Sequence, residues 1–282
     1  MNFSIVSKKA LKSVFKKRDA WSHKGQYGRL LVVGGSKRFH GSPAFNCLAA
    51  YKAGCDLVFL VAPQRAADLV ATFSPSMITY PLVGDFLQSK HANAVFGVAR
   101  DYGATAMLVG GGLWRERQTL EAIREIVERT QLPLVLDADG LRAIADSPRL
   151  LEGKTCVLTP HSEEFRVLTG TKPPNDEKKR MILVKQAARK LGATIILKGH
   201  VDVVSDGNCV ALNKTGNQFM TKGGFGDCLA GVVGAFLARG VVPFKAACAA
   251  SFLLGRAGEL ASREKKESLM PLDAIRKFKE VL

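Results

Sequence analysis

Short runs of β-branched and other apolar residues alternate with segments of helical periodicity along most of the chain. The pattern predicts strands near residues 29–35, 56–63, 106–112, 133–138, 155–159 and 194–199. It predicts helices near residues 43–53, 64–72, 118–129, 161–169, 177–191, 226–238 and 245–260. Because strands and helices alternate in this way, we expect an α/β fold with a mostly parallel central sheet and helices on both faces.

The alternation changes after Lys198. Residues 201–212 contain two short strand patterns joined by a Ser-Asp-Gly-Asn turn, which predicts a β-hairpin in this place. The basic amino terminus, with apolar residues between its lysines, favours an amphipathic helix over a transit peptide. The linker-like stretch at residues 171–176 is too short to separate domains, so we expect residues 1–282 to form a single domain.

Composition narrows the classes of function. A chain of 282 residues with 47% hydrophobic content can bury a large core, and no run reaches the ~18 to 20 apolar residues that cross a bilayer. The formal charge of +16 raises the question of nucleic acid, but the basic residues are spread over helices and mixed with acidic ones. We therefore expect neither a membrane nor a nucleic-acid partner, and an anionic substrate or a generally basic surface explains the charge better.

The cysteines and histidines exclude some kinds of site. The six cysteines form no CxxC pair and four lie in apolar patterns, which is typical of buried thiols in a reducing compartment and predicts a cytoplasmic protein. The five histidines show no paired ligand spacing, so the sequence predicts no zinc site. A bound metal would be Mg²⁺ on phosphate.

Glycine-rich and polar residues follow the predicted strands. In a parallel sheet, ligands bind beyond the carboxyl ends of the strands, so these residues converge on one edge. They are Gly34-Gly35-Ser36 with Gly41-Ser42-Pro43, Gly110-Gly111-Gly112, Asp137-Ala138-Asp139, Thr159-Pro160-His161 with Glu164, and Lys198-Gly199. Each group also has a structural interpretation: a tight turn for the glycines, a helix cap for Asp139, a solvated helix end for His161 and Glu164, and a strand terminus for Lys198.

The segment Gly223-Gly224-Phe225-Gly226-Asp227 opens a long apolar helix pattern. Its backbone N–H groups and the positive end of the helix suit a phosphate group. A carboxylate at the same place repels phosphate unless it takes part in the chemistry, so Asp227 is a candidate base that deprotonates an attacking hydroxyl. A capped, tightly packed turn is the alternative interpretation.

The order of these motifs along residues 22–260 resembles the NAD(P)H-hydrate dehydratase family of the ribokinase-like superfamily. The resemblance is carried by Ser22-His23-Lys24-Gly25-Gln26-Tyr27-Gly28, Val32-Val33-Gly34-Gly35-Ser36, Gly41-Ser42-Pro43, Gly110-Gly111-Gly112, Asp137-Ala138-Asp139-Gly140, Thr159-Pro160-His161-Ser162-Glu163-Glu164, Lys198-Gly199 and Gly223-Gly224-Phe225-Gly226-Asp227. It implies an enzyme that uses ADP, or ATP, with Mg²⁺ to dehydrate the S epimer of hydrated NADH or NADPH (NADHX, NADPHX).

The resemblance also implies roles for residues. Asp227 would be the catalytic base. The hydrated substrate would contact Ser42, Gly112, His161 and Asp227. From their positions at a strand end and a helix start, Asp137 is a further candidate for the substrate and Glu164 for an indirect contact with Mg²⁺. The nucleotide would contact Lys198, Gly199, His200, Val201, Asp202, Gly224, Phe225 and Gly226. A homotetramer and a separate epimerase as pathway partner are further expectations from the resemblance.

The chain departs from the family pattern at four positions. Ser42 stands where the family usually has Ala, Gly111 where it has Pro, Trp114 where it has Gly, and Phe225 where it has Thr. Two other interpretations remain open. One is a small-molecule kinase of the same fold, such as a hydroxyethylthiazole or sugar kinase, and the other is a catalytically inactive nucleotide-binding protein.

Overall fold

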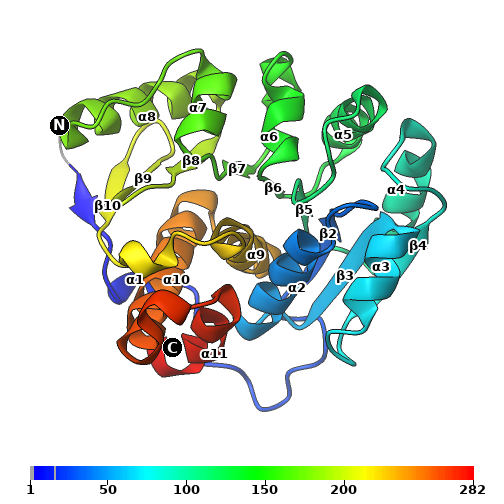
Figure 1. The fold of residues 1–282 in the computed structure, drawn as a ribbon, viewed down its shortest axis with the longest axis horizontal. Helices are drawn as coiled ribbons and strands as arrows, with labels where there is room; N and C mark the ends of the chain where they lie inside the picture. The colour runs from blue at the N-terminus through cyan, green and yellow to red at the C-terminus, as the bar shows by residue number, and fades with distance from the viewer. Residues whose placement is uncertain (1–2, 16) are drawn as a thin grey trace.

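A single sheet runs through the computed structural model, which describes residues 3–15 and 17–282 (Figure 1). The strand order is β1-β10-β9-β8-β7-β6-β5-β2-β3-β4. The bounds are β1 Ser4–Ile5, β2 Arg29–Val33, β3 Leu57–Pro63, β4 Ile78–Leu82, β5 Ala106–Val109, β6 Leu134–Leu136, β7 Cys156–Leu158, β8 Thr194–Leu197, β9 Asp202–Ser205 and β10 Val210–Asn213. Neighbouring strands are parallel except where β9 pairs with β8 and β10, which confirms the mostly parallel sheet.

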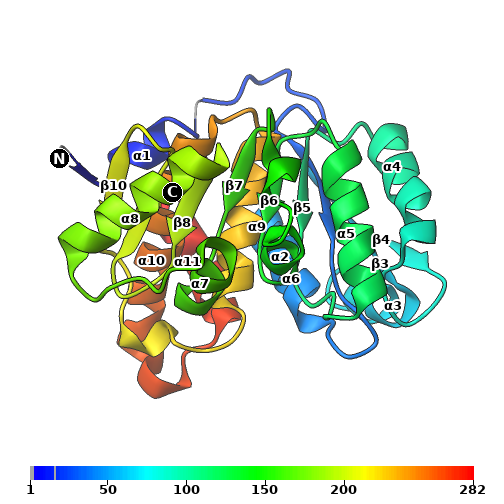
Figure 2. The ribbon, with the colours of Figure 1, turned by 90° about the horizontal axis from the view of Figure 1, so that it is seen from above.

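Helices cover both faces of the sheet (Figures 1 and 2). One face carries α4 Ala92–Asp101, α5 Arg117–Arg129, α6 Asp139–Ile144, α7 Ser162–Thr169 and α8 Glu177–Leu191. The other carries α1 Lys9–Lys12, α2 Gly41–Lys52, α3 Gln64–Ala71, α9 Phe225–Ala238, α10 Pro243–Lys265 and α11 Pro271–Val281. Single 3₁₀ turns lie at Ser89–His91, Pro148–Leu151, Gln218–Met220 and Lys266–Ser268.

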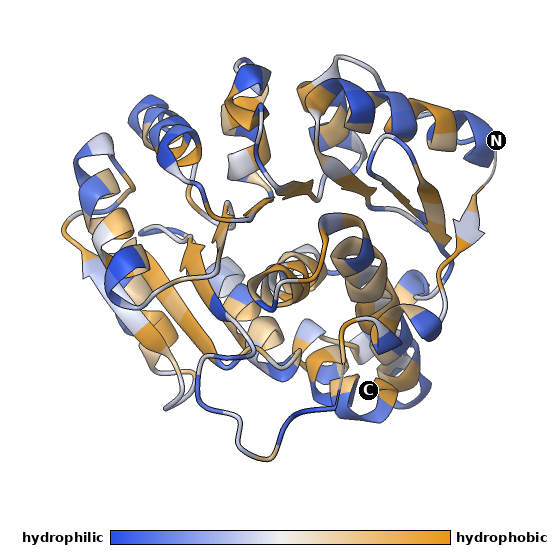
Figure 3. Ribbon diagram, turned by 180° about the vertical axis from the view of Figure 1, so that it is seen from behind, coloured by the Kyte–Doolittle hydropathy of each residue, from blue (hydrophilic) through white to orange (hydrophobic). Residues whose placement is uncertain are grey.

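The side-chain alternation of β2 shows why the sheet is covered twice. Leu30 and Val32 belong to the core beneath α2 and α9, whereas Leu31 and Val33 belong to the core beneath α4–α8. Since successive side chains of a strand point to opposite faces, an unbroken apolar run requires a helix layer on each side. Figure 3 shows the result: apolar strands and an apolar α9 inside, with hydrophilic outer surfaces on the covering helices.

The expected β-hairpin is confirmed as β9 and β10, which pair antiparallel with Ala211 opposite Val204. Other expectations need correction. The pattern missed β1, β4, α4 and α6. The amino-terminal helix has only four residues, Lys9–Lys12, and is preceded by β1, which pairs parallel with β10. Residues near Ile5, which the apolar pattern assigned to a helix, therefore pair with β10 at the sheet edge instead.

Within the part of the chain that the structure describes, no helix combines the length and the apolar character needed to cross a membrane. The thiols of Cys47, Cys55, Cys156, Cys228 and Cys248 are buried and unpaired in disulfides, and Cys209 is exposed. Burial of most thiols agrees with the interpretation from the sequence.

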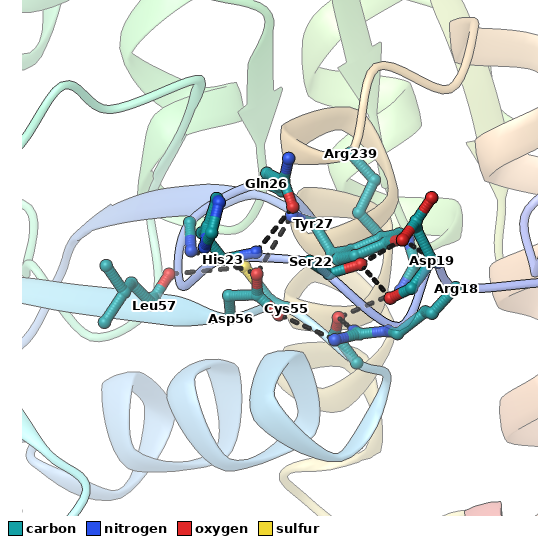
Figure 4. A network of polar contacts seen from close by, with 12 residues as sticks. Arg18, Asp19, Ser22, His23, Gln26, Tyr27, Cys55, Asp56, Leu57 and Arg239 are labelled. Carbon is teal, nitrogen blue, oxygen red and sulfur yellow. Dashed lines mark hydrogen bonds and ion pairs between the residues drawn. The ribbon is translucent and has the colours of Figure 1, made fainter.

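The segment at residues 22–28 lies at the amino-terminal end of β2, whereas ligands are expected at the carboxyl ends of the strands. Figure 4 shows this segment beside Asp56 and Arg239. Asp56 holds it, accepting hydrogen bonds from the backbone N–H groups of Gly25 and Tyr27, both at 3.0 Å. Arg239, directly after α9, donates to the carbonyl of Gly54 at 2.9 Å and stacks near the Tyr27 ring. This part of the family pattern therefore fixes the carboxyl end of α9.

The network predicts a stability effect for Asp56→Ala. The substitution leaves two backbone N–H groups and Arg18, which is 3.0 Å from the carboxylate, without their acceptor. We expect the free energy of unfolding, measured with urea, to fall by about 1–3 kcal/mol. Asp101→Ala, which removes an exposed carboxylate paired only with its neighbour Arg100, is the matched control and is expected to cost less than ~0.5 kcal/mol. Equal losses for the two variants would contradict this role of Asp56.

Candidate functional site

The carboxyl ends of β2, β5, β6, β7 and β8 lie along one edge because these strands are mutually parallel. The glycine loops and polar residues expected to meet there do so. Gly35 donates its N–H to the carbonyl of Gly111 at 2.8 Å, and Lys198 reaches Asp137 from a neighbouring loop. The loop after β2 therefore contacts the loop after β5, and the loop after β8 contacts that after β6.

The start of α9 enters this edge from the other layer of the molecule. Gly224 precedes the helix with φ of +101°, and a Cβ there would overlap the Phe45 ring, so both conformation and space require glycine. Asp227 is the third residue of the helix, and Asn46 of α2 donates to its carbonyl at 2.8 Å. Gly231 allows α9 to lie directly against the backbone of Asn46. The glycine loop therefore fixes the position of Asp227 through α2.

A buried ion pair lies beside Asp227. The Nζ of Lys198 is 3.0 Å from Oδ1 of Asp137 and 3.8 Å from Oε2 of Glu164. The Thr159 hydroxyl donates to the same Asp137 oxygen at 2.7 Å. Burial by itself lowers the pKa of Lys198, but the carboxylates of Asp137, Glu164 and Asp227 together raise it, so the ammonium group stays charged.

The carboxyl group of Asp227 has an unusual pKa. Burial, and then the charge of Asp137, raise it to about 7, although the Ser42 side chain and Lys198 act in the opposite direction. A carboxyl group with a pKa in this range exchanges protons near neutral pH, as a general base must. The structure thus supports reactivity at Asp227 beyond the capping of a turn.

His161 and Glu164 form the reciprocal cap of α7. Nδ1 of His161 accepts the backbone N–H of Glu164 at 3.2 Å, and Glu164 accepts the backbone N–H of His161 at 2.9 Å. The helix-end interpretation is therefore confirmed. The same cap also turns the Glu164 carboxylate towards Lys198, so these residues border the ion pair.

A cavity of about 700 Å³ opens beside the start of α9. Six of the residues expected at the nucleotide line this cavity: Lys198, Gly199, His200, Asp202, Phe225 and Gly226. His161, expected at the hydrate, also lines it. Val201 and Gly224 lie next to these in the chain but do not line it. Thr221, Lys222 and Gly223, which precede the start of α9, also line it. The sequence reasoning missed the opposite wall, formed by Thr215, Gly216, Asn217, Gln218, Met220, Leu229, Ser251, Leu254 and Gly255.

Close packing explains why that wall gave no signal in the sequence. Gly255 of α10 faces Thr215, and a Cβ there would overlap the Thr215 side chain and backbone. A glycine within an apolar helix pattern indicates only a close contact, whose partner is decided by the fold. On the near wall, burial raises the pKa of Asp202 to about 6, although hydrogen bonds from Asn213 and Gly199 lower it.

Ser42 and Gly112 lie on the other side of Asp227, outside the lining of the cavity. A Cβ on Gly111 would stand 3.0 Å from Oδ1 of Asp227 and 3.1 Å from Cβ of Ser42, so this glycine brings the loop against both. Oδ1 of Asn46 is buried at the same place and has no partner within the described residues. Asp227 therefore lies between this packed loop and Gly226, which lines the cavity, with an unused acceptor nearby.

One structural interpretation at this edge was wrong. Asp139 does not cap α6; it lies in the first turn, where its Oδ2 accepts the N–H of Trp114 at 2.9 Å. Trp114 has φ of +78°, the left-handed region in which glycine is favoured. Phe225 packs its ring into the core beneath α9, with 6% of its surface exposed.

No group of three or more potential metal-ligating side chains occurs in residues 3–15 and 17–282. Asp137 and Glu164 are hard oxygen donors at the site, but Lys198 contacts both of them. These two carboxylates would suffice for Mg²⁺ only if phosphate oxygens supplied further ligands, which agrees with the expectation of a metal carried on a nucleotide.

Known proteins that resemble this chain include dehydratases of the family that its motifs suggested. The family described as NAD(P)H-hydrate dehydratase matches residues 30–280. The bifunctional NAD(P)H-hydrate repair enzyme Nnr of Pyrobaculum aerophilum is 41% identical over 267 residues, covering 94% of this chain and 52% of that protein. The ADP-dependent (S)-NAD(P)H-hydrate dehydratase of Cenarchaeum symbiosum is 40% identical over 248 residues, covering 87% of this chain and 84% of that protein. This chain thus spans about half the length of the bifunctional relatives it matches.

A solved structure gives the same result at the level of the fold. The ADP/ATP-dependent NAD(P)H-hydrate dehydratase of Bacillus subtilis, co-crystallised with ATP and Mg²⁺, superposes with a TM-score of 0.83 at 25% identity. The alignment covers 100% of this chain and 98% of that one.

The parallel sheet, with a glycine loop opening α9 at its carboxyl edge, is a ribokinase-like α/β fold. Within that class, the match over residues 30–280 is specific, and the chain belongs to the NAD(P)H-hydrate dehydratase family.

The ion pair predicts a large effect for Lys198→Met. Removal of the ammonium group leaves Asp137, whose side chain is only 4% exposed, without its counter-charge. We expect the free energy of unfolding to fall by roughly 3–5 kcal/mol. The double variant Lys198→Met with Asp137→Asn is expected to recover most of this loss, and a double variant as unstable as the sum of both single variants would exclude the pairing.

The raised pKa of Asp227 predicts a change of stability with pH. The unfolded carboxyl group ionises near ~3.9, well below its folded value of about 7, so its contribution to stability is lost as pH rises between these values. Asp227→Asn cannot ionise. We expect the variant to exceed the wild type in free energy of unfolding by about 1–4 kcal/mol near pH 8 and to match it near pH 4. Urea unfolding at both pH values checks this, and a pH-independent difference would contradict the shift.

Proposed function

We propose that the chain dehydrates the S epimer of NADHX and NADPHX back to NADH and NADPH, using ADP, or ATP, as phosphoryl donor. The observation that carries this proposal is the carboxyl group of Asp227, with a pKa of about 7, at a helix start between a cavity and the Ser42–Gly112 loops. The printed names of the relatives supply the substrate and the nucleotide.

In the proposed reaction, Asp227 removes the proton from the ring hydroxyl of the hydrate. The hydroxyl oxygen then attacks the terminal phosphorus of ADP, forming the phosphate ester and releasing AMP. Elimination follows: the C–O bond breaks, phosphate leaves, and loss of a ring proton restores the dihydropyridine. A base with a pKa near 7 is available at neutral pH for the first step.

Positive charge and backbone donors oppose the charge that develops on the transferred group. A Cβ on Gly226 would stand 3.1 Å from Nζ of Lys198, so the ammonium group lies against the glycine loop. The N–H groups of Gly224, Phe225 and Gly226 belong to the first turn and its cap, where the helix presents N–H groups without intrahelical partners. Lys198 also keeps Asp137 neutralised, which limits repulsion of phosphate.

When bound, Mg²⁺ would neutralise part of the charge on the phosphates. Of the described carboxylates, Asp137 and Glu164 are the pair that the Lys198 ammonium group brings together at this edge, and we propose that Glu164 acts on the ion indirectly. Its backbone contact with His161 holds the side chain in place for that purpose.

The two sides of Asp227 divide the ligands. We propose that Lys198, Gly199, His200, Val201, Asp202, Gly224, Phe225 and Gly226 serve the nucleotide, and that Ser42, Gly112, His161, Asp137 and Asp227 serve the hydrate. Of the four departures from the family pattern, Gly111 and Ser42 lie against Asp227 without blocking it.

Four wider expectations also remain proposals. The continuous sheet supports treatment of residues 1–282 as one domain. The buried thiols support a reducing, cytoplasmic location. A homotetramer and a separate epimerase that supplies the S epimer follow from the family resemblance alone.

The proposed dehydration can be assayed directly. With NADHX, ADP and Mg²⁺, we expect absorbance of the dihydropyridine to rise in step with release of inorganic phosphate. A stable phosphorylated product with no recovery of NADH would indicate a small-molecule kinase instead. Binding of nucleotide without either product would indicate an inactive nucleotide-binding protein.

Asp227→Asn tests the base. The amide cannot accept the proton, so we expect kcat to fall by at least about 10²-fold, the usual contribution of a positioned base, while ADP still binds. In the wild type, kcat/KM is expected to rise with pH through about 7, because the ionised carboxylate is the reactive form. Unchanged turnover in the variant, or a flat profile over this range, would remove Asp227 from this role.

A further inference from the structure

Three neighbouring side chains beside Ser42 have no role in the reaction as described. They are Arg38, Phe39 and Trp114, which we call the Trp114 shelf. The guanidinium carbon of Arg38 lies 4.6 Å from the centre of the Trp114 ring, and the Phe39 and Trp114 rings are 5.5 Å apart with planes inclined at 31°. The loop after β2 and the loop after β5 thus meet through side chains as well as backbone.

The shelf is continuous with the candidate hydrate site. A Cβ on Gly112 would stand 2.9 Å from Cβ of Phe39 and 3.4 Å from Cβ of Ser42, and a Cβ on Gly111 would reach both Ser42 and Asp227. The order in space is therefore shelf, glycine loop, Asp227. A ligand whose reacting hydroxyl reaches Asp227 from this side extends past the shelf.

The conformation of Trp114 is strained. A bulky residue at φ of +78° costs of order 1 kcal/mol, which other contacts must offset. Here the backbone N–H is held by Asp139 at 2.9 Å, and the ring is held against Arg38 and Phe39. Strain of this kind at the rim of a site is a reason to look for a ligand contact.

The positive charge of Arg38 differs from that of its basic neighbours. Its two basic neighbours in space or sequence are paired, Lys37 with Asp85 at 2.8 Å and Arg115 with Asp139 at 3.7 Å. Arg38 makes no ion pair with any carboxylate of residues 3–15 and 17–282. A guanidinium group that stacks on an indole keeps its N–H edge available in a fixed plane, which suits a bidentate contact with phosphate.

We propose that the Trp114 shelf is a specificity determinant that binds a phosphate group of the dinucleotide substrate, with Arg38 as the phosphate contact and Trp114 as the support that fixes its orientation. Two phosphates of such a substrate have the required chemistry: the bridging pyrophosphate, present in every form, and the 2′-phosphate, present only in the NADP series. The inference rests on the proposed function for the identity of the substrate.

Binding of unreactive dinucleotides tests the shelf without any turnover. In a Trp21→Phe background, Trp114 is the remaining tryptophan, and energy transfer from its indole to the reduced nicotinamide of NADH or NADPH reports binding. We expect Arg38→Gln to weaken binding about tenfold or more, the loss typical of one charged hydrogen-bonding contact. A loss confined to NADPH identifies the 2′-phosphate; equal losses for NADH and NADPH, with weaker competition by ADP-ribose, identify the pyrophosphate.

Lys37→Gln is the matched control, since it removes one positive charge from the adjacent residue, which is paired with Asp85. We expect it to change binding by less than about twofold, as for an exposed ion pair. If Arg38→Gln and Lys37→Gln behave alike, the shelf is not a phosphate site.

Trp114→Gly tests the support. Glycine adopts the same φ without strain, so the variant is expected to fold, and calorimetry checks that it does. Measured by competition with a fluorescent nucleotide analogue, its affinity for NAD(P)H is expected to fall as far as that of Arg38→Gln, and the double variant to lose little more. In the dehydration assay both variants should raise KM with kcat nearly unchanged. A normal affinity in Trp114→Gly overturns the proposal, whereas absent dehydration with Arg38-dependent binding overturns only the proposed function.

Discussion

The ion pair of Lys198 with Asp137 is the interaction on which the site depends. It joins the end of β8 to the end of β6 in a place where a lone carboxylate or ammonium group would be costly to bury. The Thr159 hydroxyl adds a third strand end to the same oxygen. Because Lys198 also lies against Gly226, the pair ties the sheet to the start of α9 and sets the electrostatic surroundings of Asp227.

Two features near the site lower the stability of the folded protein, and other contacts must offset them. A carboxyl group with a pKa of about 7 is destabilising when it ionises, and Trp114 keeps a backbone conformation that few residues other than glycine adopt. The compensation lies in parts of the molecule distant from the reaction. The apolar α9 packs between the sheet and α2, and the network of Asp56, Tyr27 and Arg239 holds its far end.

The surroundings of Asp227 differ on its two sides. The cavity lined by Lys198, Gly199 and α10 lies on one side of Asp227, and the loops bearing Ser42 and Gly112 lie on the other. In the proposed reaction, the phosphoryl donor would approach Asp227 from the first side and the hydroxyl acceptor from the second. A Cβ on Gly111 would stand 2.9 Å from Oδ1 of Asn46 and 3.0 Å from Oδ1 of Asp227, so the loop after β5 passes close to both side chains.

The sequence by itself determined the α/β class, the hairpin at β9 and β10, and the set of strand ends at which the chemistry lies, because side-chain periodicity and strand direction are local properties. It also singled out Asp227, since a carboxylate beside a glycine-rich loop at a helix start is conspicuous in the sequence. Only the tertiary structure decided the opposite wall of the cavity, the ion pair of Lys198 and Asp137, and the contact of Asp139 with Trp114. These features depend on which loops meet in space. The same holds for the pKa of Asp227, which is raised by burial and by the charge of Asp137, a residue far away in the chain.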